Sequence, residues 1–102
     1  MIEMARGEPK CDEATAEAIR ELVAHTMAAR ESAGFVNNAV ILSLDVWDKI
    51  RYAKTHPFTF HEARNGLNRA YMPITRADGT ETEIRVILIS DAVADPDFIE
   101  VI

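Results

Sequence analysis

The first third of the chain shows the hydrophobic periodicity of an amphipathic helix. Between residues 12 and 33, apolar and long side chains recur at the i, i+3, i+4 and i+7 positions that line one face of a helix. This stripe consists of Ile19, Leu22, Val23, Thr26, Met27 and Arg30. Asp12 stands near the start, where the helix dipole favours acids, and Gly34 follows the last turn, where glycine can turn left-handed. The pattern predicts one long helix over residues 12–33.

The opposite face of this predicted helix is less polar than a face exposed to water usually is. Its residues are Ala24, Ala28 and Ala29 together with Glu17, Glu21 and Glu31. A second structural element or a second subunit could pack against such a face. Alanine is also the best helix former, so helix propensity on an exposed face explains the same residues equally well.

A short apolar run and a capping residue follow this helix. The run Ala39–Leu42 is hydrophobic at every position, which is typical of a strand covered on both faces. Ser43 then provides the N-cap of a second helix, which we expect to reach about Thr55 before Pro57 ends it. The residues that this helix would bury are Val46, Trp47 and Ile50.

Residues 59–62 have the form of a helix capping box. Thr59 and Glu62 occupy the two ends of the box, and Phe58 precedes it in the position of a hydrophobic staple. The pattern therefore predicts a short third helix that ends near Asn65 and Gly66.

The rest of the chain has the pattern of β-strands. Two apolar segments, residues 71–75 and 83–89, flank the Asp78–Gly79 pair, which is a strong signal for a hairpin. Pro73 cannot donate a backbone hydrogen bond, so its strand should lie at a sheet edge. Residues 98–102 form a last short strand. The predicted order is α-β-α-α-β-β-β, a two-layer α+β fold with a mostly antiparallel sheet of about four strands and helices on one face.

Length and composition fit one domain. The chain has 102 residues, of which 48% are hydrophobic and 27% are charged. We expect residues 12–102 to form a single domain that folds by itself, and residues 1–11 to form a flexible N-terminal segment. Cys11 is the single cysteine, which excludes an intramolecular disulfide. The apolar runs are too short for a secretion signal or a membrane span, so a cytoplasmic protein is expected.

Charge is segregated along the chain. The net charge is −6, but residues 1–48, 49–76 and 77–102 carry −5, +5 and −6. The bases of the middle segment are Lys49, Arg51, Lys54, Arg64, Arg69 and Arg76. If these residues form one surface patch, that patch would dock on an acidic surface of a protein partner or of a second copy. Chance clustering of solvated charges produces the same pattern, because sequence blocks need not become surface patches.

This charge pattern favours a non-enzymatic protein-interaction or assembly module over an enzyme. A small acidic inhibitor or immunity-type protein, whose target would be a basic site on its partner, belongs to the same class. The sequence contains no glycine motif that cradles phosphate and no Gly-x-Ser-x-Gly nucleophile elbow, and it suggests no cofactor.

His56, His61 and Glu62 form the one group that resembles a metal or acid–base site. A small enzyme or metal-binding domain built on them is an alternative function. The two histidines stand on either side of Pro57 and of the predicted helix cap, so their rings need not converge, and a third metal ligand is unassigned. The sequence therefore predicts no catalytic residues and no metal ligands.

A single-stranded nucleic-acid binder is a further alternative. The aromatic residues in and beside the basic segment are Trp47, Tyr52, Phe58, Phe60 and Tyr71, and such rings can stack on bases. Trp47 and Phe58 fit the core better, because each belongs to an apolar pattern. The acidic remainder of the chain also opposes phosphate binding, which argues against nucleic acid as the main partner.

The run from Ala39 to Ile50 resembles the strand-then-helix segment in the core of tailed-phage capsid proteins. The likeness covers a dozen residues, and capsid subunits are far longer, so no residue role is carried over. What the resemblance implies is an accessory or structural protein of a phage or mobile element.

Overall fold

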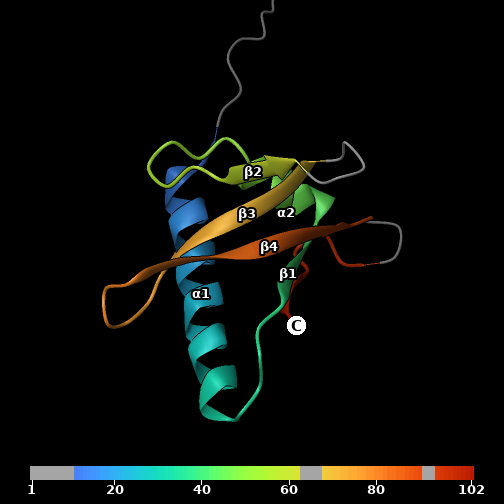
Figure 1. Ribbon diagram of the computed structural model, residues 1–102. Coiled ribbons are helices and arrows are strands. Elements are labelled where there is room, and N and C mark those ends of the chain that lie inside the picture. The colour runs from blue at the N-terminus through green and yellow to red at the C-terminus, as the bar shows by residue number, and fades with distance from the viewer. Residues whose placement is uncertain (1–10, 63–67, 91–93) are drawn as a thin grey trace, which may run out of the picture.

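The computed structural model of the protein describes residues 11–62, 68–90 and 94–102, which form two helices and a five-stranded sheet (Figure 1). The elements are α1 (Glu13–Ser32), β1 (Ala39–Ser43), α2 (Leu44–Ile50), β2 (Thr59–Glu62), β3 (Asn68–Thr75), β4 (Glu81–Ile89) and β5 (Ile99–Val101). The strand order is β2-β3-β4-β1-β5, in which β1 and β4 pair in parallel and the other three pairs are antiparallel. The predicted α+β fold with a mostly antiparallel sheet is confirmed.

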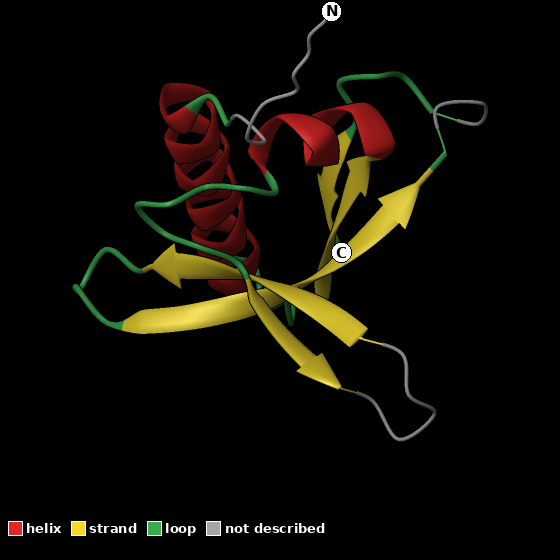
Figure 2. Ribbon diagram, turned by 90° about the horizontal axis from the view of Figure 1, so that it is seen from above, coloured by secondary structure: helices red, strands yellow, loops and turns green. Residues whose placement is uncertain are grey.

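Both helices cover the same face of the sheet. Seen from above, α1 and α2 lie on one side of the strands, and no helix of the described chain lies on the other side (Figure 2). The strand residues that form the core are Val40, Leu42, Met72, Ile74, Ile84, Val86 and Val101. They stand at alternate positions of their strands, because successive side chains of a strand point to opposite faces.

Helix α1 forms where the periodicity predicts it, but its buried face is turned relative to the predicted stripe. Asp12 caps the helix by accepting a hydrogen bond from the Thr15 backbone N–H at 3.2 Å. The buried residues are Ala16, Arg20, Val23 and Met27. Leu22, which we expected inside, is 52% exposed. The predicted stripe did not include Arg20, whose side chain lies against the sheet and donates a hydrogen bond to the Pro73 carbonyl oxygen.

Helix α2 is shorter than predicted. Ser43 caps it as expected, with its Oγ accepting from the Val46 N–H at 3.1 Å, and the predicted residues Val46, Trp47 and Ile50 are buried. The helix ends at Ile50 rather than near Thr55. The chain then runs as a loop that returns to the core at Phe58, whose ring meets Trp47 edge-to-face with a centroid distance of 5.0 Å.

The predicted third helix over residues 59–65 is wrong, because the described part of this segment is strand β2. Thr59 pairs with Tyr71 and Glu62 pairs with Asn68 in an antiparallel ladder with β3. A capping box is a local signal of modest energy. Here Phe58 packs in the core against Trp47, and the residues after it join β3, so tertiary pairing overrides the local preference.

Strand β3 shows how Pro73 fits into a sheet. β3 lies between β2 and β4, but β2 pairs only with Asn68–Tyr71, so Pro73 lies beyond the end of β2. The prediction that this strand lies at the edge of the sheet is therefore wrong, because β3 pairs on both sides. The edge of β3 that faces β2 is free at the proline, which accommodates its missing N–H. The following turn is the predicted hairpin, with Gly79 at φ +87°.

Cys11 is the one described residue of the predicted flexible segment 1–11, and residues 1–10 lie outside the described ranges. It is partly buried against the core, and its Sγ lies 3.7 Å from the Ile50 carbonyl oxygen. Burial raises the pKa of the Cys11 thiol. The thiol is therefore less reactive than a free cysteine, since the thiolate is the nucleophilic form.

Candidate functional site: a groove along helix α1

A groove of about 500 Å³ runs between α1, the loop after α2 and the end of β3. Its lining residues are Glu17, Arg20, Glu21, Ala24, His25, Ala28, His56, Thr75 and Ala77. Ala24 and Ala28 come from the face of α1 that the sequence marked as unusually apolar, and this face is one wall of the groove. A second hollow of about 260 Å³ shares Ala24, Ala28 and Ala77 and extends the groove along α1 to Glu31 and Arg76.

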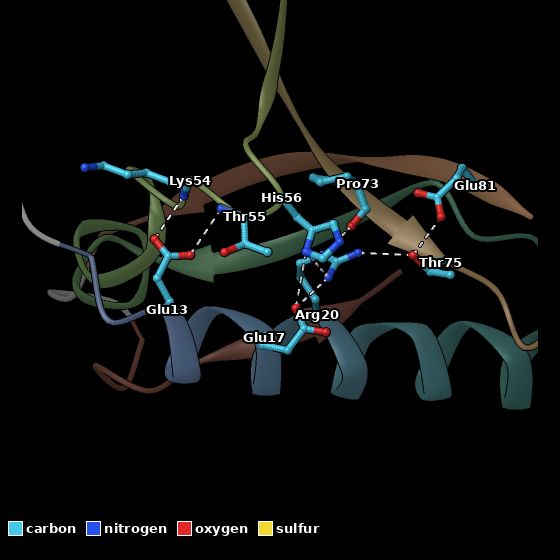
Figure 3. A network of polar contacts seen from close by, with 9 residues as sticks. All are labelled: Glu13, Glu17, Arg20, Lys54, Thr55, His56, Pro73, Thr75 and Glu81. Atoms are coloured by element: carbon cyan, nitrogen blue, oxygen red, sulfur yellow. Dashed lines mark hydrogen bonds and ion pairs between the residues drawn. The ribbon is translucent and has the colours of Figure 1, made fainter. Parts of the chain in front are cut away.

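Arg20 lines this groove and is the central charge of a network of polar contacts (Figure 3). Its side chain is only 7% exposed. The guanidinium Nε donates to the Pro73 carbonyl oxygen at 2.8 Å, and Nη1 donates to Glu17 Oε1 at 2.7 Å. This geometry places a buried cation at the free edge of β3, where the Pro73 carbonyl has no partner strand. Each bond is charge-assisted, which offsets part of the cost of burying the guanidinium.

His56 completes the network from the loop after α2. Its Nδ1 lies 3.0 Å from Arg20 Nη1 and 3.4 Å from Glu17 Oε1. Because a guanidinium has only donors, a hydrogen bond between these two atoms requires that Nδ1 accepts and that the ring proton is on Nε2. His56 therefore acts as a hydrogen-bond acceptor for Arg20, a role that differs from metal ligation.

Thr75 and Glu13 make hydrogen bonds that connect the segments on either side of the groove. Arg20 Nη2 lies 3.4 Å from Thr75 Oγ1, which donates in turn to Glu81 Oε2 at 2.9 Å. On the other wall, Glu13 accepts from the backbone N–H groups of Lys54 at 2.9 Å and Thr55 at 3.4 Å. The Lys54 N–H bond lowers the pKa of Glu13. These contacts attach the loop after α2 to the start of α1 and so position His56.

The rim of the groove is acidic. Glu17 and Glu21 are one helical turn apart on α1, and the charge of Arg20 is already shared with Glu17. At the far end, Arg76 Nη1 donates to both Glu31 oxygens at 2.8 and 3.1 Å, and these bonds lower the pKa of Glu31. That pair is neutral as a unit. Glu21 has no ion-pair partner within the described ranges, so the negative charge of the rim is not balanced internally.

The described bases of the segment 49–76 differ in their partners. Three have partners in the chain: Lys49 with Asp45, Arg51 with Asp48 and Arg76 with Glu31. Within the described ranges, the side chains of Lys54 and Arg69 have no ion-pair partner, and Arg64 lies outside those ranges.

Two of these bases lie near opposite ends of α1. Lys54 lies at Glu13, near the start of α1, and Arg76 lies at Glu31, near its end. At a rise of about 1.5 Å per residue the two acids are about 27 Å apart. A single partner surface would therefore have to be long to meet both bases.

The structure assigns His56, His61 and Glu62 to different surroundings. His56 faces α1, whereas His61 Nε2 lies 3.2 Å from Glu83 Oε1, and the His61 ring meets Tyr71 edge-on. Glu62 is exposed at the end of β2. In the part of the chain that the structure describes, no three His, Cys, Asp or Glu side chains are grouped to hold a metal ion.

Arg20 is the site residue that sequence reasoning missed. One signal was available, since Arg20 stands three residues before Val23 and seven before Met27, at the spacing of the buried face. The partners of Arg20 could not be read from the sequence. They are 53 and 36 residues away, at Pro73 and His56, and only the tertiary fold brings them to α1.

Further observations bear on the assignment of a function. Among the described residues, no helix has both the length and the apolar composition that crossing a bilayer requires. No protein-family model matches the chain, and searches of curated proteins and of solved structures return no match. The resemblance of residues 39–50 to phage capsid proteins stays a prediction. The groove and the chemistry of its side chains are therefore the basis for a functional assignment.

Proposed function

We propose that this protein is a protein-interaction module that binds a basic segment of a partner protein in the groove along α1. The observation that carries the proposal is the groove itself, about 500 Å³ with small apolar residues in its walls and an acidic rim whose charge is not balanced within the described chain. Its volume lies in the range of ordinary ligand sites. A partner surface that offers lysine or arginine would complement this rim.

Helix α1 has a local electrostatic cost that such a partner would relieve. Glu17 and Glu21 stand at i and i+4, and like charges at this spacing destabilise a helix by a few tenths of a kcal/mol, roughly. Arg20 offsets the charge of Glu17 from below, at 2.7 Å from Oε1, and leaves Glu21 without a cation. A partner's ammonium or guanidinium group between the two carboxylates would remove the repulsion.

The small side chains of the groove favour a long, partly aliphatic occupant. Ala24 and Ala28 from α1 and Ala77 from the turn after β3 leave space where larger residues would fill the groove. Lysine and arginine carry apolar stems that pack on such surfaces while their charged ends stay near water. The groove therefore suits a basic segment better than a purely polar or purely apolar one.

This proposal keeps the class of function that the charge pattern favours, a protein-interaction module. It moves the binding surface from the basic segment to the acidic groove. The sequence suggested that a basic segment docks on an acidic partner, whereas three of the described bases are paired with acids of the chain. The acidic inhibitor or immunity-type alternative agrees with an acidic groove. In that alternative this protein supplies the acidic surface and its partner supplies the basic site.

A labelled helical peptide of leucine and lysine is a suitable probe, with binding followed by fluorescence anisotropy. We expect Glu21→Lys to weaken binding about tenfold or more, which corresponds to about 1.4 kcal/mol. Ala28→Trp should have a similar effect because the indole fills the groove, and Ala28 is exposed, so the fold should tolerate it.

Glu62→Lys is the matched control for charge. It changes the net charge equally at an exposed residue of β2 outside the groove, and it should alter the affinity by less than about twofold, as expected for screened surface charges. If Glu62→Lys weakens binding as much as Glu21→Lys does, the peptide responds to net charge alone and the groove is not its site. Equal binding of a leucine–glutamate peptide would also contradict the proposal.

A further inference from the structure

The face of the sheet that carries no helix is apolar at its centre. Ile41 of β1 pairs with Ile87 of β4, and Ile89 follows two residues later on the same face. None of the three belongs to the hydrophobic core between sheet and helices, and each is partly exposed. The helices lie behind this face in Figure 1.

The sequence of the two central strands fits a sheet that is covered on both faces. β1 reads Ala39–Leu42 without a polar residue, and the second half of β4 is equally apolar from Val86 to Ile89. A sheet with one solvated face normally alternates apolar and polar residues. The described chain covers one face only, so the expectation that Ala39–Leu42 is covered twice is not met within it.

Polar residues on the same face lie toward β2 and form hydrogen bonds with one another. Glu83 accepts hydrogen bonds from Thr59 Oγ1 at 2.8 Å and pairs with His61 at 3.2 Å. The uncovered apolar residues therefore lie on the other half of the face, over β4 and β1 and beside β5.

Two charges flank the isoleucine pair on opposite sides. Arg85 stands two residues before Ile87 on β4, and Glu100 of β5 pairs with Ile41 across the adjacent ladder. Side chains two residues apart on a strand, or directly paired across strands, point to the same face. Neither Arg85 nor Glu100 has an ion-pair partner within the described ranges, so the face presents an unpaired cation and an unpaired anion around an apolar centre.

We infer that a second copy of this chain covers this face, which makes the protein a two-fold symmetric homodimer. A surface that meets itself across a two-fold axis must be self-complementary. Arg85 and Glu100 lie at about the same distance, about 7 Å, from the centre of the Ile41–Ile87 pair. An axis that lies between the two copies, passes over this centre and bisects the directions to Arg85 and Glu100 brings Arg85 of each copy opposite Glu100 of the other. The isoleucines then pack together at the centre, with two ion pairs beside them. This inference is independent of the function proposed for the groove, which lies on the helix side of the sheet.

The size of the face sets the expected strength of the dimer. Four strands, β3, β4, β1 and β5, cover a width of about 19 Å if each occupies about 4.8 Å, and a strand of five residues is about 17 Å long. The flat area is thus on the order of 300–500 Å², below the roughly 800 Å² per partner of a standard interface. We therefore expect a dimer with a Kd in the micromolar range rather than a permanent complex.

Light scattering after size-exclusion chromatography, from about 1 µM to about 1 mM, measures this equilibrium directly. The wild-type protein should shift from monomer to dimer within this range. Ile87→Lys should raise the Kd about tenfold or more because it places two lysines at the centre of the interface. Leu22→Lys is the matched control, since Leu22 is an exposed apolar residue of α1, and it should leave the Kd unchanged.

A charge exchange identifies the second copy as the partner. Arg85→Glu and Glu100→Arg should each weaken the dimer, because each places like charges opposite each other, and the double variant should restore most of the affinity. Circular dichroism checks that each variant is folded, and the charge exchange remains informative if Ile87→Lys does not fold. A wild-type protein that stays monomeric up to about 1 mM, or a dimer that is unchanged by Ile87→Lys and by both charge reversals, would overturn the inference.

Discussion

The two faces of the sheet differ in the contacts that their side chains make within the described chain. On the helix side, the groove surrounds a buried cation, Arg20, whose guanidinium is bonded to Pro73, Glu17 and His56 within 3.0 Å. On the other side, Ile41 and Ile87 meet no helix of the described chain. The groove side is thus a polar network with an acidic rim, and the open side is an apolar patch with one charge of each sign.

This difference suggests two kinds of partner. An acidic rim selects for a basic group and is sensitive to salt, because exposed charges are screened within about 8–10 Å at physiological ionic strength. An apolar patch gains its energy from area removed from water, which salt does not screen. Association through the groove should therefore weaken as salt rises, and association through the open face should largely persist.

The largest loss of stability is expected from a substitution in the hydrophobic core, on which both faces of the sheet depend. Trp47 is buried in the core and contacts Phe58, the residue that leads from the loop of the groove into β2. Trp47→Ala should cost about 3–5 kcal/mol of unfolding free energy, because it leaves a large cavity. Urea denaturation followed by circular dichroism measures this change. A loss below about 1 kcal/mol, typical of surface sites, would show that Trp47 is not a core residue.

A smaller effect, confined to the groove side, is expected from Arg20→Met. Methionine keeps much of the volume but leaves the Pro73 carbonyl and one Glu17 oxygen without their donor, which should cost about 2–3 kcal/mol. Lys54→Met removes an exposed base beside the same groove and should change stability by less than about 0.5 kcal/mol. Equal effects of the two substitutions in urea denaturation would mean that the Arg20 network contributes no more than a surface charge.

The smallest effect concerns the pH dependence at the far end of the groove. Hydrogen bonds from Arg76 hold the pKa of Glu31 below its usual value. A carboxyl whose pKa is lowered on folding stabilises the protein above its ordinary pKa, about 4.3, and this contribution is lost as pH falls through the lowered value. Glu31→Gln should therefore flatten the acid branch of a stability–pH curve measured by thermal unfolding.

Glu62→Gln provides the comparison for the acid branch, since Glu62 is exposed on β2 and has no ion-pair partner in the described part of the chain. Its curve should follow the wild type. An acid branch that Glu31→Gln leaves unchanged would show that the Glu31–Arg76 pair does not stabilise the folded protein in solution.

Local patterns predicted those elements whose signals come from neighbouring residues. The 3.6-residue period and the acidic Asp12 near the helix start predicted α1, Ser43 predicted the start of α2, and Asp78–Gly79 predicted the hairpin. Each of these signals acts over a few residues, so no distant partner is needed to read it. The same reasoning failed at Thr59–Glu62, where a capping box competed with a ladder to β3 and the ladder prevailed.

The sequence by itself therefore determined the fold class, most of the helix and strand positions, the burial of Trp47 and the segregation of charge along the chain. Only the tertiary structure decided which charges meet. It paired Arg76 with Glu31 across 45 residues and placed Arg20 against Pro73 and His56. It also left Ile41 and Ile87 uncovered by either helix. The physical reason is that burial and pairing depend on distances between segments far apart in the chain, and a sequence pattern reports only on neighbours.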